Sequence, residues 1–173
     1  MYQFDRIYEG YTSDWRQNIV AFKWDDSHEY AFCLKYNQER LAYTTSENAI
    51  PLIRLPEMYY IIAECTPSAQ ESADILNKVR QSRGIPYSEE LQATGFDSPD
   101  ANSVENKQQT RRINEIMKEY RKEFYAEGQL FFFLKAHNYS TYYGCGLANM
   151  TSKEYQMPLP DNEKIFGNNS TTK

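Results

Sequence analysis

With 173 residues, the chain is long enough for one domain with a sizeable core, so we predict a single module over residues 1–173. Its net charge of −5, with no basic cluster longer than TRR or VRQSR, excludes the electrostatic footprint of a nucleic-acid-binding protein. The longest apolar runs, MYYIIAEC and LFFFL, fall far short of the roughly 20 residues needed to cross a bilayer, which excludes a membrane span.

Residues 1–50 are predicted to form an extended or hairpin layer. In the stretch EYAFCLKYN, aromatic and aliphatic residues stand at every second position from Tyr30 to Tyr36, which is the period of a half-buried strand. The stretch IVAFKW precedes it, and DDSH at 25–28 suits a hairpin connection between the two. We therefore expect a small antiparallel or loop-rich layer at this end.

Residues 51–136 are predicted to be helical. In IRLPEMYYIIAEC, Pro56 suits the first turn of a helix that we expect to be buried on more than one face. Its apolar residues at helical spacing are Leu55, Met58, Tyr59, Ile62 and Cys65. A second helix follows at once, because Thr66 can cap it and Gly84 can take the left-handed conformation that ends it. Two helices joined by so short a turn form an αα-hairpin.

A surface loop is predicted over 85–105, where TGFDSPDANS is rich in Asp, Ser, Gly and Pro. A third helix is predicted from about Lys107 to at least Ala126. Gly128 then breaks or bends this helix, so that QLFFFLK can turn its phenylalanines into the core. Residues 137–173 are predicted to be a loop and an extended tail, since MPLP carries two prolines.

The third helix carries four glutamates at a spacing of four residues, namely Glu115, Glu119, Glu123 and Glu127. Such a row can be catalytic, metal-binding or one face of a structural helix. Metal binding has weak support, because the chain has 2 histidines and no Glu-x-x-His. An acid and base of the glycosidase type can be drawn from any two carboxylates, so the row is not specific for one. We predict no catalytic residue, no metal site and no cofactor.

The row drifts around the helix, because each step of four residues overshoots one turn by about 40°. It therefore starts in solvent, so we expect Glu115 and Glu119 to be solvated and paired at helical spacing. Their expected partners are Lys118, Lys122 or Arg112. The row ends at the core, where Glu127 would be costly to bury without a basic partner from another helix. The candidates for that partner are Arg54, Arg80 and Arg83.

Three stretches in this order resemble the C-terminal signature of the SusD/RagB family of outer-membrane nutrient-binding proteins. They are IRLPEMYYIIAE (53–64), ILNKVRQSRG (75–84) and EYRKEFYAEGQLFFFLK (119–135). The tail MPLPDNEKIFGNN looks like the closing segment of the family, and DWR at 14–16 is similar to a weaker upstream element.

The resemblance implies a mainly α fold, in which tetratricopeptide-like helix pairs pack with an irregular, partly β N-terminal layer and an extended C-terminal tail. It also implies a lipoprotein of the Bacteroidetes outer membrane that captures a glycan or other nutrient at the cell surface. Such proteins do not cleave the ligand, and they deliver it to a TonB-dependent outer-membrane transporter. Members begin with a signal peptide and a lipid-attached Cys. The sequence shows neither, so it looks like the C-terminal portion of such a protein, whose membrane contact is that lipid anchor.

The signature specifies eight polar residues, for which functional and structural roles compete. Paired charges between packed helices usually fix the register of those helices, so we favour a structural role. In particular, Glu123 and Glu127 are expected to clamp their helix to an Arg of the preceding hairpin. The full set is Arg54, Glu57, Glu64, Asn77, Arg80, Arg83, Glu123 and Glu127.

Exposed aromatic side chains on loops are the candidate ligand contacts, because stacking on a sugar needs a flat apolar face. The candidates are Tyr139, Tyr142 and Tyr143 in NYSTYYG, together with Trp24 and His28. The competing interpretation is that each of them is half-buried packing.

Two other classes of function stay open. A helix-pair module could bind another protein through a concave face and have no small-molecule ligand. An enzyme would need converging carboxylates or a nucleophile with its base, and the sequence favours no such triad.

Overall fold

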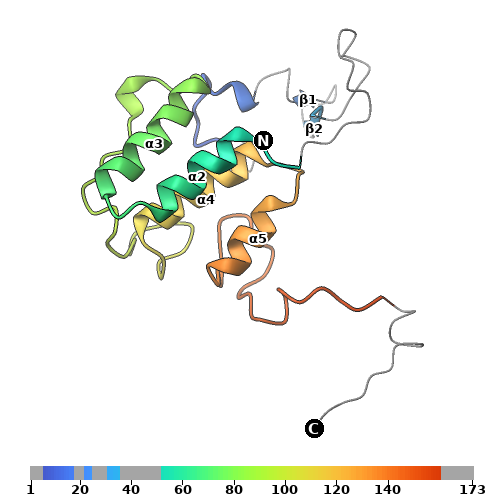
Figure 1. Cartoon of the computed structure of the whole chain (residues 1–173). Coiled ribbons are helices and arrows are strands. Elements are labelled where there is room, and N and C mark those ends of the chain that lie inside the picture. Colours follow the sequence, from blue (N-terminus) through green and yellow to red (C-terminus); the bar gives the residue numbers. More distant parts are fainter. Residues whose placement is uncertain (1–5, 18–21, 25–30, 36–51, 161–173) are drawn as a thin grey trace.

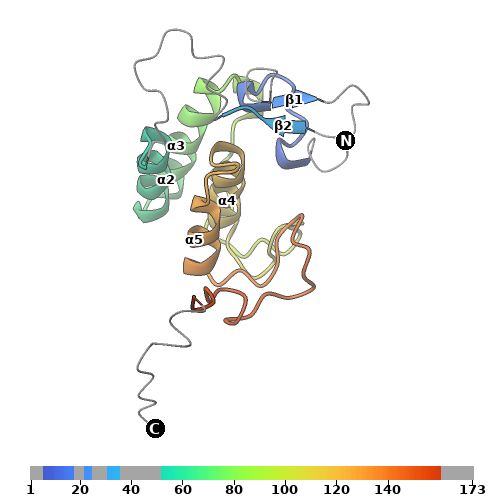
Figure 2. The ribbon, with the colours of Figure 1, turned by 90° about the vertical axis from the view of Figure 1, so that its right-hand side faces the viewer.

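The computed structural model describes residues 6–17, 22–24, 31–35 and 52–160. Within these ranges the fold is mainly α, as predicted, and helices α2 to α5 are its main regular elements (Figure 1). Figure 2 shows three layers: α2 and α3 stand on one side, α4 and α5 form the middle, and the short strands and the loops lie on the other side.

The first helix pair consists of α2 (Leu55–Cys65) and α3 (Ala69–Ser82), which confirms the predicted αα-hairpin. Ser68, rather than the predicted Thr66, caps α3, because its side chain accepts a hydrogen bond from the backbone N–H of Glu71. Thr66 instead closes α2. The hydroxyl of Ser72 donates to the carbonyl of Ala63 at 2.6 Å and ties the two helices together.

The second helix pair consists of α4 (Arg111–Glu123) and α5 (Gln129–Ala136). The predicted third helix was therefore too long at both ends. It begins later because Thr110 caps it, accepting from the N–H of Ile113. It ends earlier because Ala126 and Gly128 take positive φ angles, of 62° and 91°. Gly128 does separate the two helices, as predicted.

The core lies between α2, α3 and the middle layer. Its members include Tyr60, Leu76, Ile116, Tyr120, Phe124 and Phe133. The rings of Tyr120 and Phe133 stack with centroids 4.7 Å apart, which holds α5 against α4. Only part of the predicted phenylalanine burial is correct, since Phe133 is buried whereas Phe132 is 61% exposed.

Helix α2 buries a narrower face than we predicted. Tyr60 and Ala63 are fully buried against its neighbours, because the small side chain of Ala63 lets the helices approach closely. Leu55, Met58 and Ile62, which belong to the predicted stripe, are exposed. Nothing among the described residues covers this side of α2.

The N-terminal layer contains a 3₁₀ turn, η1 (Trp15–Gln17), and two strands, β1 (Phe22–Trp24) and β2 (Ala31–Cys33). The strands pair antiparallel with Phe22 opposite Cys33, which confirms the predicted strand pair; its connection lies outside the described residues. The ring of Phe22 packs edge-on against that of Tyr125, 5.3 Å away, and so fixes the strands to the turn between α4 and α5.

The connections carry little regular structure, as predicted. The loop between α3 and α4 holds one further 3₁₀ turn, η3 (Tyr87–Glu89), and residues 137–160 follow α5 without another regular helix or strand. The predicted tail beyond 160 lies outside the described residues. None of the helices in the described ranges combines the length and hydropathy that a bilayer-spanning segment needs.

The glycine after α3 provides a test of this fold. Gly84 has a φ of 92°, and a Cβ there would collide with the Ser13 carbonyl and lie 2.8 Å from Nε1 of Trp15. We expect Gly84→Ala to lower the free energy of unfolding by about 3 kcal/mol, from backbone strain and the clash together. Gly95→Ala is the control, because its φ is 70° but the space is open. It should cost about 1 kcal/mol. Equal costs, measured by urea denaturation, would contradict the close contact.

Candidate functional site

A row of buried carboxylates runs along α4. Glu115 is 7% exposed, Glu119 is 1% exposed and Glu123 is 3% exposed. The expectation that Glu115 and Glu119 are solvated is therefore wrong. That expectation was based on α4 alone. In the structure the N-terminal segment 6–17 lies against the face of α4 that carries the glutamates, and it contributes charged partners of its own.

Glu119 lies at the centre of the row and contacts three cations. Arg16 is 2.8 Å away, Arg80 is 3.1 Å away, and Lys122 is 2.5 Å away, the last being one of the partners predicted at helical spacing. Burial raises the pKa of Glu119, but the charges of Arg16, Lys122 and Arg80 outweigh it and hold the pKa well below its usual range. The carboxylate therefore stays ionised within the core.

The C-terminal half of the row is clamped to the helix hairpin, as expected. Arg54 contacts Glu123 at 2.6 Å and Glu127 at 2.9 Å, and Arg83 contacts Glu123 at 2.9 Å. Lys35, which follows β2, reaches Glu127 at 2.7 Å. The predicted ion pair between Glu127 and an Arg of another helix is therefore present.

The carboxylates of this row are engaged in ion pairs. A carboxyl group acts as a general acid when its pKa is raised towards the working pH. Burial raises the pKa of Glu123, but hydrogen bonds and charge from Arg83 and Arg16 lower it overall. Glu115 is held by Lys118 at 2.9 Å, another predicted pair. Among the residues that the structure describes, no group of three or more His, Cys, Asp or Glu side chains is arranged to hold a metal ion.

Removing the central carboxylate should destabilise the fold. Glu119→Gln leaves Arg16 and Arg80 without their shared counter-charge inside the protein, so we expect a loss of about 3–5 kcal/mol in the free energy of unfolding. Glu89→Gln, at an exposed position, is the control and should change this free energy by less than about 0.5 kcal/mol. Similar denaturation midpoints for both variants would show that the row contributes little.

Acid should weaken the fold in a defined window. Burial raises the pKa of Glu9, but Lys122 and Lys118 lower it overall to about 2, and the pKa of Glu119 is also lowered. A carboxyl group with a lowered folded pKa stabilises the fold above its unfolded value of about 4.3, and this contribution is lost as pH falls towards the folded pKa. We expect the free energy of unfolding to fall between about pH 5 and pH 2. A flat profile there would contradict these lowered pKa values.

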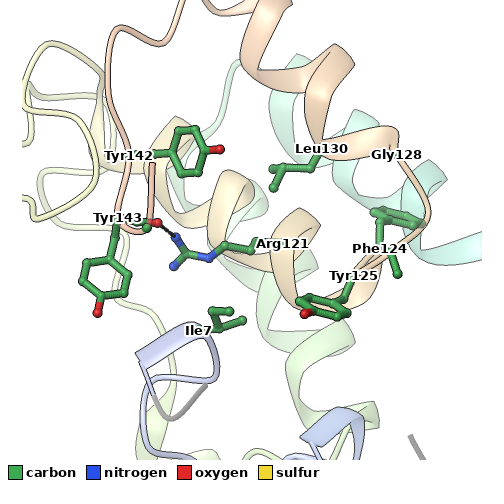
Figure 3. Close-up of a pocket in the computed structure, with 10 residues that line it drawn as sticks. Ile7, Arg121, Phe124, Tyr125, Gly128, Leu130, Tyr142 and Tyr143 are labelled. Carbon is green, nitrogen blue, oxygen red and sulfur yellow. Dashed lines mark hydrogen bonds between the residues drawn. The ribbon is translucent and has the colours of Figure 1, made fainter. Parts of the chain in front are cut away.

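An aromatic pocket lies at the corner between α4 and α5 (Figure 3), with a volume of about 290 Å³. Its walls come from five parts of the chain: the N-terminal segment, α4, the turn between α4 and α5, the start of α5 and the loop after α5. The side chains that form it are Ile7, Arg121, Phe124, Tyr125, Leu130, Tyr142 and Tyr143. We call this the tyrosine pocket.

A buried ion pair fixes the loop that carries the two tyrosines. Arg121 binds Glu105 through both terminal nitrogens, at 2.6 and 3.0 Å, and also donates to the carbonyl of Tyr143 at 3.1 Å. The N–H of Tyr143 donates in turn to Glu105 at 2.8 Å. The loop is therefore held by charge-assisted hydrogen bonds to both the N–H and the carbonyl of one residue, Tyr143.

The two tyrosines differ in how they face the pocket. In Figure 3 the ring of Tyr142 points towards Leu130 across the cavity, whereas the ring of Tyr143 points away from it. Burial raises the pKa of Tyr142, so its hydroxyl stays protonated and can donate. The Arg6 guanidinium lies 5.2 Å from the centre of the Tyr143 ring. Tyr142 is thus the better placed of the two to contact a ligand.

Of the other predicted ligand residues, Tyr139 does not line this pocket. Tyr139 is fully buried and its hydroxyl donates to Asn114 at 2.8 Å, so the expectation that it presents an exposed face is wrong. It packs in the core because the chain turns inwards after α5. Trp24 lies in β1, and His28 lies outside the described residues.

Sequence reasoning missed most of the pocket. Ile7 and Tyr125 belong to segments that are far apart in sequence, and no spacing links them. No role is predicted for Arg121 from the sequence, and Glu105 falls at the end of a predicted surface loop. Buried Arg–Glu pairs of this kind depend on tertiary packing, so a single sequence gives no signal for them.

These features define a helix-pair protein with a loop-built aromatic pocket and with no metal-ligand cluster in the described ranges. The model of the SusD family matches residues 7–173, which includes the DWR segment as well as the three signature stretches. The chain therefore belongs to the SusD family, whose members are generally non-catalytic proteins that bind glycans or other nutrients at the cell surface. Comparison with curated proteins and with solved structures gave no match.

Proposed function

We propose that the protein binds a nutrient, with an oligosaccharide as the first candidate, in the tyrosine pocket. The observation that carries this proposal is the Tyr142 ring, which is turned towards the cavity on a loop fixed by Arg121. Sugars present apolar C–H faces and polar hydroxyl edges, and a tyrosine offers both kinds of contact. Family membership supports nutrient binding as the general role.

The pocket has polar groups that can orient a sugar. Burial raises the pKa of Tyr142, so its hydroxyl stays protonated and can donate to a ligand oxygen. The remaining walls, such as Leu130 and Phe124, are apolar and exclude water. A small number of polar groups in an apolar pocket is typical of small-ligand sites.

We further propose that the protein does not cleave its ligand. Among the residues that the structure describes, no carboxylate lines the tyrosine pocket, and the α4 carboxylates are engaged in ion pairs. Hydrolysis of a glycosidic bond usually requires two carboxyl groups flanking that bond. Binding without turnover suits a protein that passes its ligand on.

The proposed setting is the outer-membrane surface, where a lipid anchor holds the protein beside a TonB-dependent transporter that receives the nutrient. Support for this setting comes from family membership alone. Co-purification with such a transporter from native membranes is the direct test. Isolation from those membranes without any transporter would count against the delivery role.

The alternative, a helix-pair module that binds another protein, is favoured by one observation. Apolar side chains are exposed along and just before α2, namely Leu52, Ile53, Leu55, Met58, Ile61 and Ile62. Contiguous apolar surface of this kind marks protein contacts. This alternative predicts capture of a protein partner with no affinity for any saccharide.

A single substitution tests the pocket. We expect Tyr142→Ala to weaken saccharide binding about tenfold, because the variant loses the ring that faces the cavity. Tyr143→Ala should have a smaller effect, since that ring points away. Isothermal calorimetry against a panel of plant and host oligosaccharides, first screened on the unmodified protein, provides the measurement.

Tyr87→Ala is the matched control, because Tyr87 is 75% exposed and lies far from the pocket lining. It should leave the affinity unchanged. Saccharide binding that survives Tyr142→Ala without loss would remove the tyrosine pocket as the site. The absence of binding to every saccharide, together with capture of a protein, would favour the alternative.

A further inference from the structure

Two of the charged signature residues differ from the rest. In the described ranges, each of the other five belongs to an ion pair between an Arg and a carboxylate, whereas Glu57 and Glu64 form no ion pair with a Lys or Arg. Glu64 contacts only Nε2 of His137, at 3.2 Å. Glu57 and Glu64 are seven residues apart on α2, which is about two turns, so their carboxylates share one face of the helix.

Both glutamates line a groove of about 240 Å³ between α2 and α5. Three aromatic side chains complete most of its wall, namely Tyr120, Phe132 and Phe133. The ring of Phe132 is 61% exposed and is therefore available to a ligand. Within the described part of the chain no Lys or Arg lines this groove, which we call the acidic groove.

The backbone adds to the negative potential there. The Glu64–His137 contact joins the carboxyl end of α2 to that of α5, and each helix end carries a partial negative charge. No basic residue lies in the last turn of α2 to offset it. Lys135, in the last turn of α5, is exposed and does not line the groove. Oε1 of Gln129 is buried in the wall with no hydrogen-bond donor among the described residues.

We propose that the acidic groove binds a small organic ammonium ion. Two carboxylates supply the counter-charge, and the exposed face of Phe132 can contact the cation and the hydrocarbon around it. A neutral sugar would leave both carboxylates uncompensated. A bare metal ion would lack ligands, since no described cluster reaches three ligating side chains.

This site is distinct from the tyrosine pocket. On α5, Gln129, Phe132, Phe133 and Ala136 recur at helical spacing and face the acidic groove, whereas Leu130 faces the tyrosine pocket. The two sites can therefore be occupied or disabled separately. The Tyr142→Ala variant should therefore lose affinity for saccharides but keep its affinity for ammonium ions.

Choline is the probe, because its charge does not depend on pH, and 3,3-dimethylbutan-1-ol is its neutral counterpart of the same shape. Measured by NMR chemical-shift titration of the protein at low ionic strength, choline should bind at least tenfold more tightly than the alcohol. Glu57→Gln/Glu64→Gln should weaken choline binding at least tenfold, and Phe132→Ala about threefold to fivefold. An arm with glucosamine and N-acetylglucosamine distinguishes an amino sugar as the source of the ammonium group.

Glu89→Gln/Glu90→Gln is the matched control, because it removes the same charge from two exposed positions outside the groove. It should leave choline affinity within twofold of the unmodified protein. Phe132 is exposed, so its truncation tests the site even if the double glutamate variant is unstable. Equal binding of choline and the alcohol, or choline binding unchanged by both groove variants, would overturn the proposal, as would no shift of the groove resonances.

Discussion

The buried carboxylate of Glu119 is the constraint on which the packing around α4 depends. An ionised group inside a core is stable only if opposite charges surround it, and here these come from η1, from α3 and from α4 itself. Arg16 is in turn held by Asp14 at 2.7 Å. Three segments are thus fixed to one another by charge, and a shift of any one would remove part of the charge compensation of Glu119.

Helix α4 also connects this charge cluster to both candidate binding sites. One side carries the glutamate row, another directs Arg121 towards the tyrosine loop, and a third presents Tyr120 to the acidic groove. The position of the tyrosine pocket therefore follows from the rigidity of the helix that the ion pairs hold. A site built on a helix with locked neighbours keeps its geometry better than one built on loops alone.

Local signals predicted much of this architecture. Pro56 and Gly84 predicted the bounds of the helix hairpin, and apolar residues at every second position predicted the strands. The phenylalanines around Glu127 indicated that this carboxylate needs a basic partner, which is Arg54. The errors arose where distant segments meet. The position of Glu119 on α4 predicts an exposed side chain, because the local sequence does not show that Arg16 packs against it. Likewise, no local pattern around Tyr139 indicates that its hydroxyl donates a hydrogen bond to Asn114. The periodicity of one sequence indicates which face of a single helix is apolar, but not which distant segment packs against that helix.

The span of the Arg16–Glu119 pair has a consequence for biosynthesis. The two residues are 103 positions apart, so the N-terminal segment leaves the ribosome long before α4 has been made. Until then Arg16 has only Asp14 as a partner and its segment cannot be buried. Contacts of such long sequence separation form late and slow the folding of a chain. We therefore expect the N-terminal segment to close over α4 after the helices have assembled.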